Sequence, residues 1–129
     1  MKRILFVDDE PRVLEGLERM LYRLRREWHM VFVSSGRDAL KRLSESEYDV
    51  LITDIRMPEM MGTALLEQVG KSHPQVFRII LSGTEDREIT MRATALAHQF
   101  LAKPCDAKVL RATVEQAPSR PHRVESPLN

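Results

Sequence analysis

The chain has 129 residues, 43% of them hydrophobic and 30% charged, which fits one globular domain with a substantial core. Its 20 Lys and Arg nearly balance its 19 Asp and Glu, so the net charge of +1 gives no global electrostatic reason to expect nucleic acid or a membrane as a direct partner. The apolar run near the N-terminus is too short for a signal peptide, no later stretch is long enough to span a membrane, and Cys105 has no second cysteine to pair with. We therefore expect a cytoplasmic protein.

Five short apolar runs, several of them rich in β-branched residues, predict five strands. They are RILFV at 3–7, MVFVS at 30–34, DVLIT at 49–53, FRIILS at 77–82 and QFLAK at 99–103. These runs are continuously apolar rather than alternating. That pattern is typical of strands covered on both faces, and it favours a parallel sheet between two layers of helices.

The segments between these runs carry apolar residues at helical spacing. The residues are Val13, Leu17, Met20 and Leu24 in the first helix, Ala39, Leu40 and Leu43 in the second, and Leu65, Leu66 and Val69 in the third. A fourth helix is predicted over 86–97 and a fifth over 107–117, with Pro11 in the first turn of the first helix and Asp106 as the N-cap of the last. The alternation predicts a (βα)5 domain over 1–117, and the proline-rich 118–129 is interpreted as a flexible tail or the start of a linker.

Polar side chains stand at the ends of four of the predicted strands. Asp8 and Asp9 follow the first strand, Asp54 the third, Ser82 ends the fourth and Lys103 ends the fifth. The second strand ends without a charge, as expected for a strand at the sheet edge. Because ligands of doubly wound sheets bind at the carboxyl ends of strands, where the strand order reverses, this pattern predicts the order 2-1-3-4-5 and a site between strands one and three.

In that order Asp8, Asp9 and Asp54 would converge. Three carboxylates so close together need either raised pKa values or a neutralising cation, and an oxygen-rich site at a loop rim favours Mg²⁺, with Mn²⁺ as the alternative. Such a site favours phosphoryl chemistry. A simpler interpretation makes Asp8 and Asp9 helix-capping acids and Asp54 a turn acid before Pro58.

The four motifs FVDDE, LITDIRMPEMMG, LSG and FLAKP, in this order over residues 2–117, resemble the receiver domain of bacterial two-component response regulators. The resemblance implies a flavodoxin-like (βα)5 fold and a phosphorylation-dependent signalling role. Asp54 would be the phosphoacceptor, while Asp8, Asp9, Asp54 and the backbone carbonyl of Arg56 would hold the metal. The domain would be no enzyme in the ordinary sense, because it promotes only its own phosphorylation and dephosphorylation.

The resemblance also implies roles for residues further along the chain. Lys103 would contact the phosphoryl oxygens, Ser82 would hydrogen-bond the new phosphoryl group, and Phe100 would turn from exposed to buried as that hydroxyl moves inward. A cis peptide before Pro104 would aim Lys103 into the site. Plain core packing is the competing interpretation of Phe100.

Partners follow from the same resemblance. The phosphoryl donor would be a sensor histidine kinase or a phosphotransfer protein. The segment AHQFLAKPCD resembles receivers attached to HD-type or HDOD output domains, so an output domain or effector of that kind is expected downstream. A homodimer would use the fourth helix, fifth strand and fifth helix, near Arg87, Arg92 and Lys108.

Two other functions use similar chemistry or a similar fold. A metal-dependent phosphohydrolase of the haloacid dehalogenase type carries a second acid two residues after its aspartyl nucleophile, whereas Asp54 is followed by Ile55 and Arg56. A nucleotide-binding flavodoxin-like module needs a glycine-rich phosphate loop, whereas the first turn reads DDEPR. The missing second acid disfavours the phosphohydrolase, and the missing glycine-rich loop disfavours the nucleotide-binding module.

Overall fold

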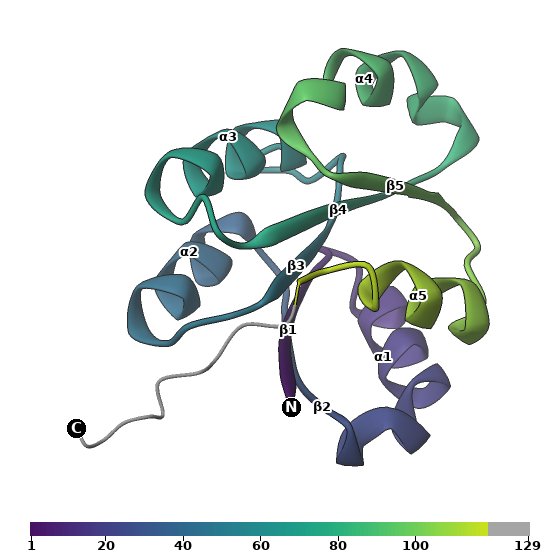
Figure 1. Ribbon diagram of the computed structural model, residues 1–129. Coiled ribbons are helices and arrows are strands. Elements are labelled where there is room, and N and C mark those ends of the chain that lie inside the picture. Colours follow the sequence, from purple (N-terminus) through teal and green to yellow (C-terminus); the bar gives the residue numbers. More distant parts are fainter. Residues whose placement is uncertain (119–129) are drawn as a thin grey trace.

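The computed structural model describes residues 1–118, and a five-stranded sheet forms its centre (Figure 1). The strands are β1 (Lys2–Val7), β2 (Trp28–Val33), β3 (Val50–Asp54), β4 (Phe77–Ser82) and β5 (Gln99–Ala102). All neighbouring strands pair in parallel, in the order β2-β1-β3-β4-β5. The predicted topology, with the reversal of strand order between β1 and β3, is confirmed.

Helices cover both faces of this sheet. They are α1 (Pro11–Met20), α2 (Gly36–Glu45), α3 (Gly62–Ser72), α4 (Arg87–Arg92) and α5 (Ala107–Val114), with short 3₁₀ helices η1 (Tyr22–Arg26), η2 (Thr84–Asp86) and η3 (Thr94–Leu96). Figure 1 shows α1 and α5 on one face and α2, α3 and α4 on the other. None of the helices within residues 1–118 combines the length and apolar character needed to cross a membrane.

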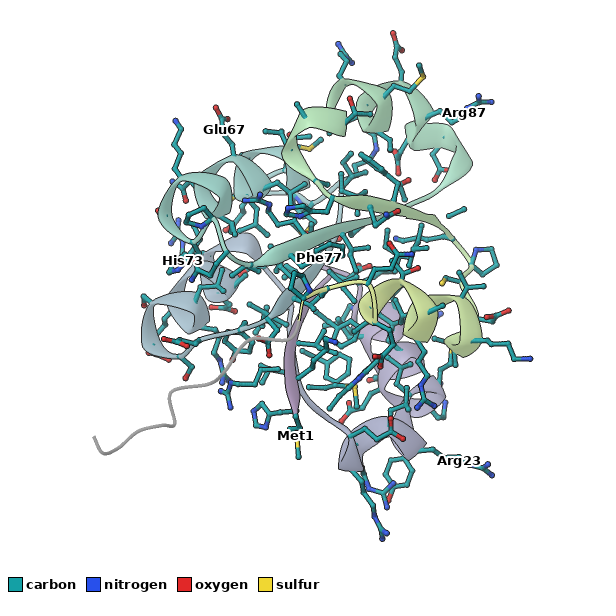
Figure 2. All side chains as sticks on the ribbon, in the orientation of Figure 1. Met1, Arg23, Glu67, His73, Phe77 and Arg87 are labelled. Atoms are coloured by element: carbon teal, nitrogen blue, oxygen red, sulfur yellow. The ribbon has the colours of Figure 1, made fainter. Side chains whose placement is uncertain are left out.

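The two faces of the sheet enclose two separate apolar cores, because successive residues of a strand point to opposite sides. Leu5 packs in the cluster that contains Leu65, which we call the α2–α3 core. Ile4 and Phe6 pack in the cluster that contains Leu110, which we call the α1–α5 core. Side chains fill the space between the sheet and both helix layers (Figure 2). Each fully buried leucine or isoleucine contributes about 2 kcal/mol through burial of its apolar surface.

Local signals in the sequence begin two of these helices as predicted. Pro11 lies in the first turn of α1, where its missing N–H costs no hydrogen bond. Asp106 caps α5, because its Oδ1 accepts a 2.8 Å hydrogen bond from the Val109 N–H. The predicted cap is therefore confirmed.

Several predicted boundaries differ from the structure. The first helix ends at Met20 instead of continuing to Leu24. The five-residue 3₁₀ helix η1 follows it, and its period of about three residues per turn keeps the buried Leu21 and Leu24 on one face. The second strand begins at Trp28, two residues earlier than predicted. The backbone of Trp28 pairs with that of Lys2 in β1, and its indole is buried. The fifth helix ends at Val114 and not at 117.

The fourth helix is the largest difference. One helix was predicted over 86–97, but the structure has six α-helical residues in α4, a break at Ala93 and then η3. No residue of α4 is fully buried, whereas Ala93 is. The segment contacts the α2–α3 core through the buried Ala93 and the partly buried Ile89 and Leu96.

Candidate functional site

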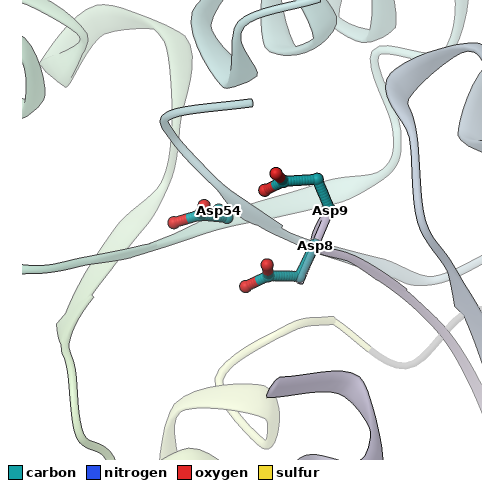
Figure 3. Close-up of side chains that lie close together, drawn as sticks. All are labelled: Asp8, Asp9 and Asp54. Atoms are coloured by element: carbon teal, nitrogen blue, oxygen red, sulfur yellow. The ribbon is translucent and has the colours of Figure 1, made fainter. Parts of the chain in front are cut away.

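Three carboxylates meet at the carboxyl edge of β1 and β3 (Figure 3). Val7, the last residue of β1, pairs with Thr53 of β3, so Asp8 comes level with Asp54 at the next position. One oxygen from each of Asp8, Asp9 and Asp54 lies within 4.8 Å of the others. Asp8 and Asp54 are buried and Asp9 is half-buried. The convergence predicted from the sequence is confirmed.

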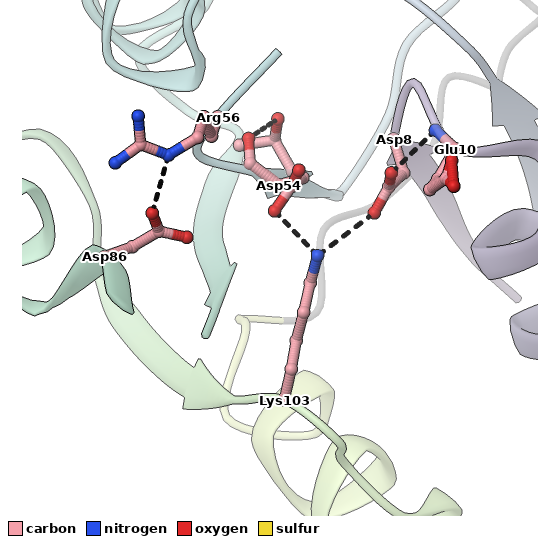
Figure 4. Close-up of polar contacts among 7 residues, drawn as sticks. Asp8, Glu10, Asp54, Arg56, Asp86 and Lys103 are labelled. Carbon is pink, nitrogen blue, oxygen red and sulfur yellow. Dashed lines mark hydrogen bonds and ion pairs between the residues drawn. The ribbon is translucent and has the colours of Figure 1, made fainter. Parts of the chain in front are cut away.

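Lys103 directly follows β5, and its side chain extends to this cluster. Its Nζ donates a 2.8 Å hydrogen bond to Oδ1 of Asp54 and lies 3.4 Å from Oδ2 of Asp8 (Figure 4). The backbone N–H of Lys103 is fixed by Ser82 O at 2.8 Å. The peptide bond between Lys103 and Pro104 is cis, as the resemblance implied. One ammonium thus faces two buried carboxylates.

The electrostatics of the cluster favour a further cation. Burial raises the pKa of Asp54, and the charge of Asp8 adds to this, while the hydrogen bond from Lys103 opposes it. Burial likewise raises the pKa of Asp8 against the Glu10 N–H and the Lys103 charge. Burial alone would lower the pKa of Lys103, but its hydrogen bond and ion pair with Asp54 outweigh burial and raise it. Since three carboxylates outnumber one ammonium, the site is short of positive charge.

The donor set fits magnesium. Its atoms are carboxylate oxygens held at a solvent-facing rim, which Mg²⁺ prefers over nitrogen or sulfur ligands. The protein does not need to supply every ligand of the ion, because Mg²⁺ retains several waters. Asp8, Asp9 and Asp54 could therefore hold the ion and still leave positions for a phosphate.

The contacts of Asp8 disfavour the capping interpretation. Its Oδ1 accepts a 2.9 Å hydrogen bond from the N–H of Glu10, which is the N-cap residue itself and not a residue of the first helical turn. Glu10 makes no side-chain cap either. Asp54 is the last residue of β3 and pairs with Leu81 of β4, so it is a strand residue and not a turn acid before Pro58.

The other predicted site residues lie nearby with less direct contacts. Ser82 ends β4 one step beyond the Asp54 pairing partner and is 9% exposed. Phe100 lies in β5 opposite Ile80 and packs, partly buried, against the α2–α3 core. The Arg56 side chain turns away from Asp54 toward Asp86, as Figure 4 shows. Sequence reasoning missed Asp86, because an acid in a predicted first helical turn has no distinguishing pattern.

Gly62 backs the site from the start of α3. Its N–H donates to Ile55 O at 2.8 Å, and a Cβ at this position would overlap the backbone carbonyl of Asp54 and lie 2.8 Å from Ile55 Cα. Only a residue without a side chain allows this approach.

We predict that Gly62→Ala lowers the free energy of unfolding by about 2 kcal/mol or more, because backbone atoms would have to move. Gly16→Ala is the matched control, since a Cβ there meets nothing within 4 Å and α1 would gain about 0.5–1 kcal/mol. Urea unfolding measures both variants. Equal stability of Gly62→Ala and the wild type would show that the close approach is not constraining.

Comparison with known proteins agrees with this geometry. The family model of the response regulator receiver domain matches residues 4–115. The transcriptional regulatory protein ZraR of Escherichia coli strain K12 is 31% identical over 126 residues, which make up 95% of this chain and 28% of that regulator. The chain therefore belongs to the response regulator receiver domain family of two-component systems, and it spans little more than a quarter of the length of ZraR.

Solved structures show the same fold. The signal receiver domain of an HD domain-containing protein from Pseudomonas fluorescens Pf-5 has a TM-score of 0.82 and 29% identity, over 90% of this chain and 93% of that one. The response regulator protein TrrA from Thermotoga maritima, in complex with Mg²⁺ and BeF, has a TM-score of 0.78 and 28% identity, over 90% and 98% of the two chains.

Proposed function

We propose that this receiver accepts a phosphoryl group on Asp54 from a phosphohistidine donor. The observation that supports this most is the cluster of Asp8, Asp9 and Asp54 with Lys103 hydrogen-bonded to Asp54. In the transfer, an Asp54 oxygen forms a bond to phosphorus while the bond from phosphorus to the donor nitrogen breaks, and the histidine keeps the electron pair and takes up a proton. The product is an acyl phosphate.

Magnesium would be held by the three carboxylates and the backbone carbonyl of Arg56. It would supply positive charge to the phosphoryl oxygens as they approach Asp54. Lys103 has a parallel role from the other side, since its Nζ already lies 2.8 Å from Asp54 Oδ1 and can turn to an added phosphoryl oxygen. The same charges support attack by water on the acyl phosphate, so the domain would promote its own dephosphorylation.

Ser82 and Phe100 would report the phosphoryl group to the surface. The Ser82 hydroxyl, at the end of the strand next to Asp54, would donate a hydrogen bond to a phosphoryl oxygen. Phe100 lies on the neighbouring strand and is only partly buried, so a change of its packing is sterically open. A population shift between two packings would then alter the partner-binding face.

A groove beside the site is suited to the donor protein. A hollow of about 450 Å³ between α1 and the segment after β5 is lined by Leu17, Met20 and Pro104, with Lys103 at its side. A donor histidine has to come within bonding distance of Asp54, so its protein must cover the adjacent rim. An apolar groove there favours a helix of a sensor histidine kinase or a phosphotransfer protein.

Downstream, the receiver would act in the cytoplasm on an output domain or a separate effector. An HD-type or HDOD output is supported by the likeness to the receiver of an HD domain-containing protein.

Exposed Met91 on α4 and Val109 on α5 support a homodimer through the face made by α4, β5 and α5. We propose residues 1–117 as the receiver. The tail or linker expected over 118–129 lies, from residue 119 on, outside the described residues.

The test is incubation with a small phosphodonor and Mg²⁺, followed by intact-mass measurement and peptide mapping. One base-labile phosphoryl adduct on the peptide that contains Asp54 is expected, and chelation of the metal should suppress it. An adduct that forms equally well in excess chelator, or that maps elsewhere, would contradict the proposal. Rapid turnover of small phosphate esters would instead favour a phosphohydrolase.

A further inference from the structure

An ion pair bridges two loops at the rim of the site. Arg56, in the loop after β3, donates from Nε to Oδ1 of Asp86 at 2.8 Å, across 30 positions of sequence (Figure 4). The two side chains differ in environment, because Asp86 is 6% exposed and Arg56 is 57% exposed. A carboxylate this buried depends on its partner, whereas the guanidinium remains free to turn through solvent.

Asp86 stands at the start of α4. It is the N-cap residue of that helix, yet its carboxylate makes no cap hydrogen bond and is directed to Arg56. Because α4 has only six residues and none is fully buried, few other contacts hold this end of the helix. The ion pair therefore fastens a weakly packed helix to the loop that directly follows Asp54.

We propose that the Arg56–Asp86 ion pair is a latch that holds the start of α4 in the unphosphorylated protein, and that a phosphoryl group on Asp54 opens it. This inference rests on the proposed function. Arg56 lies two residues beyond Asp54, so the new dianion gives its guanidinium a competing partner with fork-like geometry. Asp86 is then left buried without its cation, and the start of α4 moves outward to hydrate it.

The local geometry permits this exchange of partners. The backbone around Arg56 is held independently, because Gly62 N–H donates to Ile55 O at 2.8 Å. Only the side chain has to turn. At the other end, the Asp86 N–H donates to Gly83 O at 3.1 Å, so movement of Asp86 is transmitted to the segment that follows Ser82.

Amide hydrogen exchange of residues 87–92 tests the latch, in the wild type and in Asp86→Asn. Glu88→Gln is the matched control, because it removes the same charge from the first turn of α4, at an exposed residue for which the described structure has no ion pair. We expect Asp86→Asn to raise exchange by about fivefold and Glu88→Gln to leave it unchanged. Equal exchange in Asp86→Asn and the wild type would overturn the latch.

A second variant separates the pair from a general loss of folding. Arg56→Gln should raise exchange as Asp86→Asn does, and the double variant should show no further increase, because the same contact is removed once. Additive increases would overturn the latch. Asp86→Glu, which keeps a carboxylate, should retain most of the wild-type protection from exchange. As a control for global folding, exchange in β1 should be equal in all variants.

Beryllium fluoride with Mg²⁺, as a stable stand-in for the phosphoryl group, tests the opening step. Exchange in 87–92 should rise in the wild type to about the level of Asp86→Asn, and it should change little in that variant. An equal rise of exchange in the wild type and in Asp86→Asn would overturn the latch but would leave the proposed function standing. Absence of any phosphoryl adduct on Asp54 would overturn the proposed function, and the opening step with it.

Discussion

Replacing Asp54 with asparagine is expected to reduce phosphoryl uptake at least about a thousandfold while the fold is kept, because an amide oxygen is a very poor nucleophile toward phosphorus. The substitution is nearly isosteric, and its amide oxygen can still accept the hydrogen bond that Lys103 donates at 2.8 Å. Burial raises the pKa of Asp54, so the neutral side chain should not destabilise the metal-free protein. Intact-mass measurement after incubation with a small phosphodonor and Mg²⁺ gives the yield.

The control is Asp38→Asn, which neutralises an exposed carboxylate in the first turn of α2. That variant should take up the phosphoryl group as the wild type does. Full adduct yield in Asp54→Asn would show that the nucleophile has been assigned to the wrong residue.

Asp8→Asn is expected to reverse the order of stability between variant and wild type when magnesium is added. Burial is the main reason why the pKa of Asp8 is raised in the folded protein, ahead of the opposing Glu10 N–H and Lys103. A carboxyl group whose pKa is higher folded than unfolded binds protons more tightly when folded, so folding stability falls as pH rises through that window. At neutral pH, without metal, the neutral asparagine should therefore stabilise the protein by about 1 kcal/mol.

Magnesium reverses the sign of the stability difference between Asp8→Asn and the wild type. Loss of one carboxylate ligand should weaken Mg²⁺ binding about 100-fold, so saturating metal stabilises the wild type and scarcely affects the variant. Urea unfolding in chelator and in excess Mg²⁺ measures both effects. In chelator, the advantage of the variant should shrink as pH falls toward the ordinary range of a carboxyl group, where wild-type Asp8 takes up its proton. A variant that is less stable than the wild type in chelator would contradict the electrostatic argument.

Strand-end chemistry made most of the site predictable from the sequence. Asp8 and Asp54 follow continuously apolar runs, and parallel pairing with reversal between β1 and β3 forces such residues together. Lys103 ends the fifth run and lies at the same edge for the same reason. Asp106 illustrates a purely local signal that is sufficient by itself, because a cap needs only residues three positions away.

Features that depend on tertiary contacts were not predictable in the same way. The second strand was predicted over 30–34, but it begins at Trp28, whose side chain packs in the α1–α5 core. The sequence over 86–97 gave no sign of the break at Ala93, where α4 ends before η3 begins. The Arg56–Asp86 contact joins loops whose adjacency only the folded sheet defines.

The sheet separates the two apolar cores, and it therefore also separates the surfaces that pack on them. Leu17 and Met20, which line the groove beside Lys103, pack with the α1–α5 core, whereas Ile89 of α4 packs with the α2–α3 core on the opposite side of the sheet. Substitutions in the proposed donor groove are thereby separated from α4 by the sheet, whereas α5 lies on the same face of the sheet as the groove. Under the proposed function, the α4 part of the effector surface could therefore change without disturbing donor recognition, and the α5 part could not.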